Sequence, residues 1–219
     1  MLVLAIDTAT PAVTAGVVEL TPDGIAQRSA RVANDARKHG ELLMPAVLDA
    51  CAEAGTSLRG LEAVVVGAGP GPFTGLRVGM VTAAALGDAL DIPVHGVCSL
   101  DAIAVDAAGE PLLVVIDARR REVYWAAYDA DGRRTAGPEV APSAAVVARI
   151  DELGAVAAAG GSAAAVGLPV RAPESPSPAG LVAVAADVLR AGLAPGPLEP
   201  LYLRRPDAVE PGARKRVTA

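Results

Sequence analysis

Lysine and histidine are almost absent from this chain of 219 residues. The only lysines, Lys38 and Lys215, lie outside any G-x-x-x-x-G-K-[ST] sequence, so no P-loop lysine is available to contact nucleotide phosphates. The only histidines, His39 and His95, form no H-E-x-x-H motif, and no serine lies at the centre of a G-x-S-x-G motif. These absences exclude P-loop ATPases and argue against hydrolysis by a zinc ion or a catalytic triad. We expect His39 to have a structural role at the start of a helix.

Aromatic residues are also scarce, at 2% of the sequence. Proteins that hold single-stranded nucleic acid usually present several aromatic side chains inside a basic groove. The aromatic residues of this chain are Phe73, Tyr124, Trp125, Tyr128 and Tyr202. With so few of them, the chain alone is predicted to be a poor binder of single-stranded nucleic acid.

Cysteines and long hydrophobic runs are few as well. Cys51 and Cys98 form no C-x-x-C pair, which argues against a disulfide framework or a zinc knuckle and fits a reducing cytoplasm. The most apolar stretch, at 78–90, is interrupted by Asp88 and is shorter than the ~20 apolar residues of a membrane span. The first residues lack the basic flank and the cleavage site of a signal peptide. We therefore expect a cytoplasmic protein that crosses no membrane.

Hydrophobic residues, by contrast, make up 52% of the chain, and the formal net charge is -6, a composition typical of a globular protein. Apolar and alternating runs separated by turn residues predict a meander of strands, followed by helices that alternate with strands. The expected elements are strands at 2–6, 12–20 and 25–32, a helix at 38–54, a strand at 63–66, a helix at 74–90, a strand at 94–97 and a helix at 100–107. This order predicts a mixed sheet flanked by helices.

A short pattern of strand, aspartate, turn and strand occurs twice. Leu4–Asp7 and the strand at 12–20 recur as Val114–Asp117 and a strand at 122–128. Two duplicated lobes would leave such a repeat, although two short hairpins can also resemble each other by chance. We predict an α/β protein of two lobes, at 1–109 and 110–219. The second lobe is expected to contain a helix at 143–153, a strand at 155–159, an exposed linker at 172–178, a helix at 179–191 and a solvated basic tail at 214–216.

Five residues suggest a degenerate nucleotide cleft. Asp7 and Thr8 end the first strand, where actin-like phosphotransferases keep a carboxylate near magnesium and phosphate. Asp117 is the counterpart of Asp7 in the second lobe, and Gly160 and Gly161 have no side chain to keep an adenosine away. The alternative is that the aspartate and threonine only satisfy the turn. For the glycine-rich loop at 69–74, a rigid turn that leads into the helix is favoured over a pyrophosphate site, because two prolines remove N–H donors.

Two helices carry more apolar residues than a surface helix needs. In the helix at 74–90, small residues recur at every fourth position, which lets another backbone approach closely. Its other positions are mostly apolar, and a helix that is apolar all round must be covered all round. The predicted partner interface consists of Leu43, Val47, Ala50, Gly75, Gly79, Met80, Ala83 and Gly87. The alternative is that the two helices merely cover each other.

Four segments carry motifs found together in one protein family. They are Ala5–Thr8, His39–Pro45, Val66–Arg77 and the stretch from Ile116 to Tyr124. These segments resemble the TsaB family, and the most specific is the G-P-G-x-F-T-G-L-R run, in which Pro72 stands where serine is usual. The resemblance covers most of the chain and implies a duplicated actin-like, RNase H-like fold with two lobes, in agreement with the repeat.

The resemblance also implies partners. These are TsaD, which transfers threonylcarbamoyl onto the adenosine beside the anticodon of tRNA, and the small ATPase TsaE. TsaD has two metal-binding histidines spaced four apart, whereas this chain has Ser99 and Ile103 at the matching positions, and neither replaces an imidazole ligand. A noncatalytic subunit without a metal or a cofactor of its own is therefore expected. ADP or ATP would bind only within the complex, and tRNA would be contacted indirectly.

Alone, the chain is expected to form a homodimer through the helices that it would offer to TsaD. Two other functions stay open at this point. One is an active small-molecule kinase of the actin-like ATPase class, which the five cleft residues suggest. The other is a peptidase acting on its relative, against which the missing metal ligands argue.

Overall fold

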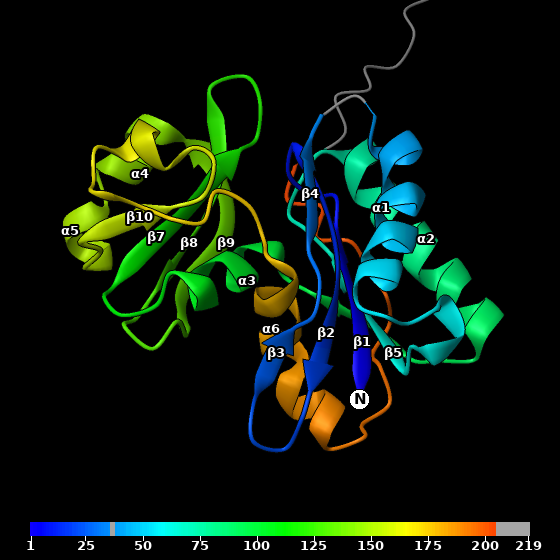
Figure 1. The fold of residues 1–219 in the computed structure, drawn as a ribbon. Helices are drawn as coiled ribbons and strands as arrows, with labels where there is room; N and C mark the ends of the chain where they lie inside the picture. Colours follow the sequence, from blue (N-terminus) through cyan, green and yellow to red (C-terminus); the bar gives the residue numbers. More distant parts are fainter. Residues whose placement is uncertain (36–37, 205–219) are drawn as a thin grey trace, which may run out of the picture.

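The computed structural model describes residues 1–35 and 38–204, and the basic tail at 214–216 lies outside them. Two mixed β-sheets form the centres of two lobes (Figure 1). The first sheet has the order β3-β2-β1-β5-β6, with β4 also paired to β2. Its strands are β1 (Leu2–Asp7), β2 (Ala12–Leu20), β3 (Ile25–Gln27), β4 (Arg31–Asn34), β5 (Ala63–Gly67) and β6 (Val94–Val97).

The second sheet repeats the arrangement of the first. Its order is β11-β10-β7-β8-β9, and its strands are β7 (Leu112–Asp117), β8 (Glu122–Tyr128), β9 (Arg134–Pro142), β10 (Ala157–Ala159) and β11 (Val170–Arg171). In both sheets the first strand pairs antiparallel with the next one and parallel with a later one. The predicted two-lobed α/β fold with mixed sheets is confirmed.

Helices cover both faces of each sheet. The helices are α1 (His39–Glu53), α2 (Phe73–Leu90), α3 (Ser99–Asp106), α4 (Ser143–Val147), α5 (Ile150–Leu153) and α6 (Pro178–Arg190), with short 3-10 turns η1 (Leu58–Gly60) and η2 (Ala163–Val166). Side chains alternate along β1, so Leu4 and Ile6 pack against α1 and α2 while Val3 and Ala5 pack against α6. In the second lobe α4 and η2 pack on the face that contains Trp125.

Two helices lie between the lobes and each covers the sheet of the other lobe (Figure 1). Leu100 and Ile103 of α3 belong to the apolar cluster of the second sheet, whereas Leu181 and Ala185 of α6 belong to that of the first. Gly180 permits the close approach of α6 to α3, because a Cβ there would overlap the carbonyl oxygen of Ala102. The strands of the two sheets thus lie on either side of residue 109 in the sequence, whereas α3 and α6 each pack on the sheet of the other lobe.

Several elements differ from the sequence prediction. The single strand expected at 25–32 is divided at Arg28 and Ser29, whose amides both donate to the carbonyl of Val17. The helix expected at 143–153 is two short helices, and β9 and β11 are additional. The linker at 172–178 is only partly exposed, because Pro176 is buried and its carbonyl accepts a 3.2 Å hydrogen bond from Thr14.

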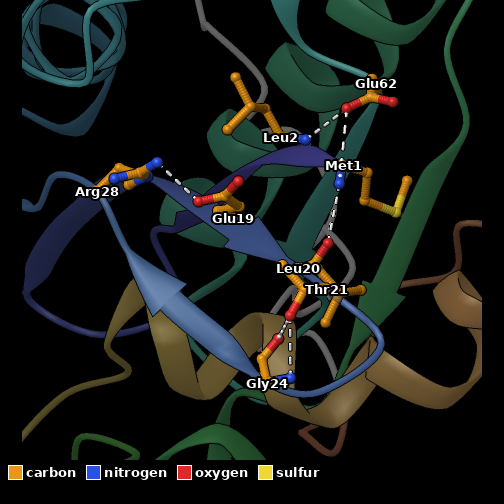
Figure 2. A network of polar contacts seen from close by, with 8 residues as sticks. All are labelled: Met1, Leu2, Glu19, Leu20, Thr21, Gly24, Arg28 and Glu62. Carbon is orange, nitrogen blue, oxygen red and sulfur yellow. Dashed lines mark hydrogen bonds and ion pairs between the residues drawn. The ribbon is translucent and has the colours of Figure 1, made fainter.

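Polar contacts hold the start of β1 against its neighbours (Figure 2). The amino group of Met1 donates to the carbonyl of Leu20 at 2.8 Å, and the amide of Leu2 donates to the carboxylate of Glu62 at 2.6 Å. The turn between β2 and β3 is closed by hydrogen bonds between Thr21 and Gly24. These contacts hold the start of β1 beside the end of β2 and close the turn into β3. Among the residues that the structure describes, no helix is long and apolar enough to cross a membrane.

Candidate functional site

Asp7 is at the centre of a buried polar cluster where β1 meets the helices of the first lobe. Its side chain is 0% exposed. One carboxylate oxygen accepts a 2.9 Å hydrogen bond from the amide of Ala9, and the other accepts a 2.5 Å hydrogen bond from the hydroxyl of Ser99 at the start of α3. A Cβ at Gly67 would overlap the same carboxylate. The carboxylate is thus enclosed and bonded on both oxygens.

Burial changes the acidity of this carboxyl group. Removal from water raises the pKa of Asp7 to about 6, and the hydrogen bonds from Ser99 and Ala9 oppose this change without cancelling it. The hydrogen bonds favour the charged form because both donors point at the carboxylate. Asp7 is therefore an acid that changes its charge within the cluster in mildly acidic solution.

Thr8 connects the turn after β1 to helix α2. Its hydroxyl donates to the carbonyl of Gly75 at 2.7 Å and accepts from the amide of Gly79 at 2.9 Å. These two helix groups are four residues apart and are partners in a regular α-helix. A Cβ at Gly75 would overlap the carbonyl of Thr8, and one at Gly79 would approach its hydroxyl too closely. The small residues of α2 thus accommodate the chain's own β1–β2 turn.

The remaining predicted polar residues of the first lobe also have structural roles. A ring nitrogen of His39 donates to the carbonyl of Thr10 at 2.9 Å, in agreement with the structural role expected for this histidine. Ser99 holds Asp7, and Ile103 is fully buried among apolar residues of the second lobe. In the described part of the chain, no group of three or more His, Cys, Asp or Glu side chains is arranged to hold a metal ion.

The five residues predicted to bind nucleotide lie in different environments. Asp7 and Thr8 are enclosed, which corrects the expectation that they face a cleft. Asp117 is exposed and accepts a 3.0 Å hydrogen bond from the amide of Arg119, so it shapes its own turn. Gly160 has a φ of 95° and lies against the carbonyl of Val115, while Gly161 is exposed. The residues do not fit a site that needs the Asp7 carboxylate, and nucleotide binding stays a prediction.

Two hollows on the first lobe involve other residues. One, of about 710 Å³, lies between the end of α2, β6 and the segment near Leu198. The other, of about 400 Å³, lies beside the end of α1 and η1. None of the five predicted nucleotide residues lines either hollow.

All eight residues predicted as the partner interface are buried inside the chain. They are Leu43, Val47, Ala50, Gly75, Gly79, Met80, Ala83 and Gly87. The side chains of this set pack on the first sheet, and a Cβ at Gly87 would overlap Val94. The prediction of these residues as an exposed surface is wrong. The regular spacing of small residues indicates that another segment packs closely on α2, but it does not show which segment this is.

A different set of residues on the same helices is open to solvent. Leu48 on α1 and Val81 on α2 are 51% and 66% exposed. Each belongs to a series spaced three or four residues apart, which places its members on one side of a helix. We call the two series the outer apolar row, in which Met44 and Val78 are half-buried and the others are exposed: Met44, Leu48 and Ala52 on α1, with Val78, Val81 and Ala85 on α2. Helices α1 and α2 lie side by side on the first lobe (Figure 1).

The segment after α6, residues 198–204, returns across the first lobe as a strap. Leu198 packs on the core of this lobe, and the amide of Leu201 donates to the carbonyl of Ala68 in the glycine-rich loop at 2.8 Å. Arg204 then donates to the carbonyl of Ala118 at 2.6 Å and pairs with Glu122. The strap therefore links α2 to the β7–β8 turn of the second lobe. No sequence pattern predicts it, because its contacts are far apart in the chain.

Comparison with known proteins adds the following similarities. A family model described as "TsaD: tRNA N6-adenosine threonylcarbamoyltransferase" matches residues 31–201. An uncharacterised protein of Mycobacterium bovis is 57% identical over 210 residues, which are 94% of this chain and 93% of that protein. The Escherichia coli "tRNA threonylcarbamoyladenosine biosynthesis protein TsaB" is 38% identical over 135 residues, which are 60% of this chain and 56% of that protein. A solved Pseudomonas aeruginosa protein described as similar to peptidase YeaZ has a TM-score of 0.77 and 30% identity, over 93% of this chain and 99% of that one.

Proposed function

Because this chain belongs to the TsaB/YeaZ family, we propose that it is a noncatalytic subunit in the formation of N6-threonylcarbamoyladenosine in tRNA and that it docks TsaD through the outer apolar row. The exposed row on α1 and α2 is the observation that carries this proposal. Large apolar side chains that lie together on a surface commonly mark a protein interface.

The inner sides of α1 and α2 support the same proposal. Leu43, Val47 and Met80 pack in the core of the first lobe, and of the outer row only Met44 and Val78 pack against that core, which leaves Leu48 and Val81 for a partner. The row is continuous with the 400 Å³ hollow that Leu48 and Ala52 line beside η1. A pair of helices from a partner would cover both features.

The enclosed Asp7 cluster supports a noncatalytic role. A phosphotransferase of the actin-like class needs its first-strand carboxylate near phosphate, whereas both oxygens of Asp7 are bonded within the chain. The kinase alternative is therefore not favoured by this geometry. In the proposed assembly TsaD carries the chemistry, TsaE completes the set, and the chain alone pairs with a second copy through the same row.

The proposal is tested by calorimetric titration of TsaD into variants of the row. Val81→Arg should weaken binding by about 100-fold, since a charge without a partner would be buried at the interface. Its melting temperature should stay near that of the wild type, because the position is 66% exposed and Arg is a good helix former.

The matched control is Val170→Arg on β11, where the valine is 54% exposed on the second lobe. This variant should bind TsaD as the wild type does. Unchanged binding of TsaD by a folded Val81→Arg variant would refute the docking surface. Steady ATP hydrolysis by the purified chain would refute the noncatalytic role.

A further inference from the structure

The aromatic side chains of this protein are divided unevenly between core and surface. Tyr124, Trp125 and Tyr128 are 5% exposed or less, whereas Phe73 and Tyr202 are 53% and 42% exposed. The two exposed rings lie together, although they come from α2 and from the strap. Their centroids are 5.3 Å apart and their planes differ by 27°, so they are stacked.

An arginine extends this stack. The guanidinium carbon of Arg77 lies 4.0 Å from the centroid of the Phe73 ring, and its Nε donates to the hydroxyl of Tyr202 at 2.9 Å. Aromatic rings and guanidinium planes are the groups on which unpaired nucleobases stack. Rings that only filled a core would be covered by other residues of the chain.

Another arginine follows on the strap, and three more lie in the turn that it contacts. Arg204 is two residues after Tyr202, so their Cα atoms are at most about 7 Å apart. Its guanidinium contacts the β7–β8 turn, where Arg119, Arg120 and Arg121 are consecutive and exposed. All three have positive φ angles, between 52° and 65°, in a region that arginine rarely adopts. The turn thus carries three exposed arginines, and Arg204 connects it to the segment that contains Tyr202.

The charge of this surface is opposite to that of the whole chain. Its arginines are Arg77, Arg119, Arg120, Arg121 and Arg204. The carboxylates near them are Asp117, which accepts from the amide of Arg119, Glu122, which pairs with Arg204, and Glu199 on the strap. Among the residues that the structure describes, these arginines outnumber the carboxylates named here, while the formal net charge of the chain is -6. A local excess of positive charge on an acidic protein favours a polyanion at that place.

In contrast to the indirect contact with tRNA expected from the sequence, we propose that Phe73, Arg77 and Tyr202, together with the arginine turn at 119–121, form a direct contact surface for a single-stranded loop of RNA. This inference rests on the proposed function, because the substrate of that function is a tRNA and its target adenosine is next to the anticodon. The rings stack on unpaired bases, and the arginines contact phosphates. The surface borders the outer apolar row, since Arg77 and Val81 are four residues apart on α2, so an RNA held by TsaD is within its reach.

The test measures binding of two fluorescent RNAs to the complex with TsaD and to the chain alone at low salt. One is a hairpin with the sequence of an anticodon stem and loop, and the other is a fully paired duplex of equal length. We expect the hairpin to bind more tightly than the duplex. Tyr202→Leu should lower hairpin affinity about tenfold, and Tyr202→Phe, which keeps the ring, should not.

The arginine turn is tested by the double variant Arg119→Gly and Arg121→Gly, because glycine accepts positive φ angles. Hairpin affinity should fall about tenfold. The slope of the logarithm of the binding constant against the logarithm of the salt concentration should become shallower by about 0.7 for each phosphate that the variant no longer neutralises. The matched control, Arg28→Ala with Arg133→Ala, removes the same charge elsewhere and should change affinity little.

Equal hairpin binding by the wild type, Tyr202→Leu and the arginine variant would overturn the inference, as would an equal loss in the control. If these variants lose TsaD affinity and keep RNA affinity, the surface is a protein interface and the inference is wrong. Failure of the proposed function is distinguished by calorimetry, in which the wild-type chain would not bind TsaD at all. Hairpin binding by the chain alone would then still support the RNA surface.

Discussion

The two lobes contain the same strand, aspartate and turn, but they use the aspartate differently. In the first lobe Asp7 is fully buried and bonded to Ser99 and Ala9. In the second lobe Asp117 is exposed and accepts a hydrogen bond from the amide of Arg119 in its own turn. Each aspartate ends the first strand of a β-hairpin, in which Asp7 pairs with Thr14 and Asp117 pairs with Val123.

The difference arises from what packs on each turn. In the first lobe α2 and the start of α3 close over Asp7, and glycines at 67, 71 and 75 make room for the turn. In the second lobe the arginine turn extends into solvent, with Arg204 of the strap beside it. A duplicated unit can thus become a buried structural element in one lobe and a surface in the other.

The largest expected effect is that of a methyl group added beside Asp7. In Gly67→Ala the new Cβ would overlap the carboxylate and crowd the hydroxyl of Ser99, two buried groups that are hydrogen-bonded to each other. We expect the free energy of unfolding to fall by about 3 kcal/mol or more, as measured by urea denaturation.

The control for this variant is Gly161→Ala in the second lobe, where the nearest atom, the carbonyl oxygen of Glu174, is at an ordinary contact distance of 3.6 Å. Its stability should stay within about 0.5 kcal/mol of the wild type. Equal stability of Gly67→Ala and Gly161→Ala would show that the Asp7 cluster is loosely packed.

The second prediction concerns pH. The pKa of Asp7 rises from 3.8 in the unfolded chain to about 6 in the folded protein. The contribution of this group to stability is therefore fully present below pH 3.8 and is lost as pH rises through about 6. The free energy of unfolding should fall by about 3 kcal/mol over this range. Asp7→Asn should remove this part of the pH dependence of the free energy of unfolding, because asparagine stays neutral.

Urea denaturation at a series of pH values compares Asp7→Asn with Asp117→Asn. The second variant should keep the wild-type dependence in this window, since Asp7 is still present. If both variants follow the wild-type curve between about pH 4 and pH 6, the burial of Asp7 has no effect on stability.

The third prediction concerns the hydroxyl that holds Asp7. Ser99→Ala would leave one oxygen of a buried carboxylate without its donor, at a cost of about 2 kcal/mol at neutral pH. Because that hydrogen bond lowers the pKa of Asp7, the variant should also titrate at higher pH than the wild type. Chemical denaturation at neutral and acidic pH measures both effects, and the exposed Ser57→Ala is the control. A loss of stability of the same size at both pH values would mean that packing is affected instead of charge.

Much of the fold follows from local patterns. The strands β2, β6 and β8 begin and end where alternation and turn residues predict. The sequence does not predict β9, because Gly137 and Pro138 interrupt an edge strand that tolerates them next to an irregular register. The exchange of α3 and α6 between lobes is also not predictable from spacing, since both helices are apolar and either sheet would accept them.

The candidate site is less predictable than the fold. Gly75, Gly79 and Ala83 indicate that something approaches α2 closely, but the partner is Thr8 and the first sheet of the same chain. The outer apolar row cannot be recognised from the sequence, because α2 is apolar on nearly all sides. The cluster of Phe73, Arg77 and Tyr202 joins residues 125 positions apart, a contact that no local pattern reveals.

The smallest effect is expected in the arginine turn. The non-glycine residues with positive φ include Arg119, Arg120 and Arg121, whereas the corresponding turn after Asp7 has none. Glycine adopts this conformation without a steric penalty, so Arg121→Gly should raise the free energy of unfolding by about 0.5 kcal/mol. The change is measured by thermal and urea denaturation.

The control for the turn is Arg133→Gly, at a position without positive φ. Glycine there gains nothing in the folded state and loses more chain entropy, so stability should fall slightly. The opposite signs of the two variants would show that the arginines at 119–121 are kept at a cost to stability, which is expected of side chains that contact RNA. A loss of stability in Arg121→Gly would instead mean that the arginine stabilises the fold, and the turn would then be structural in the second lobe as it is in the first.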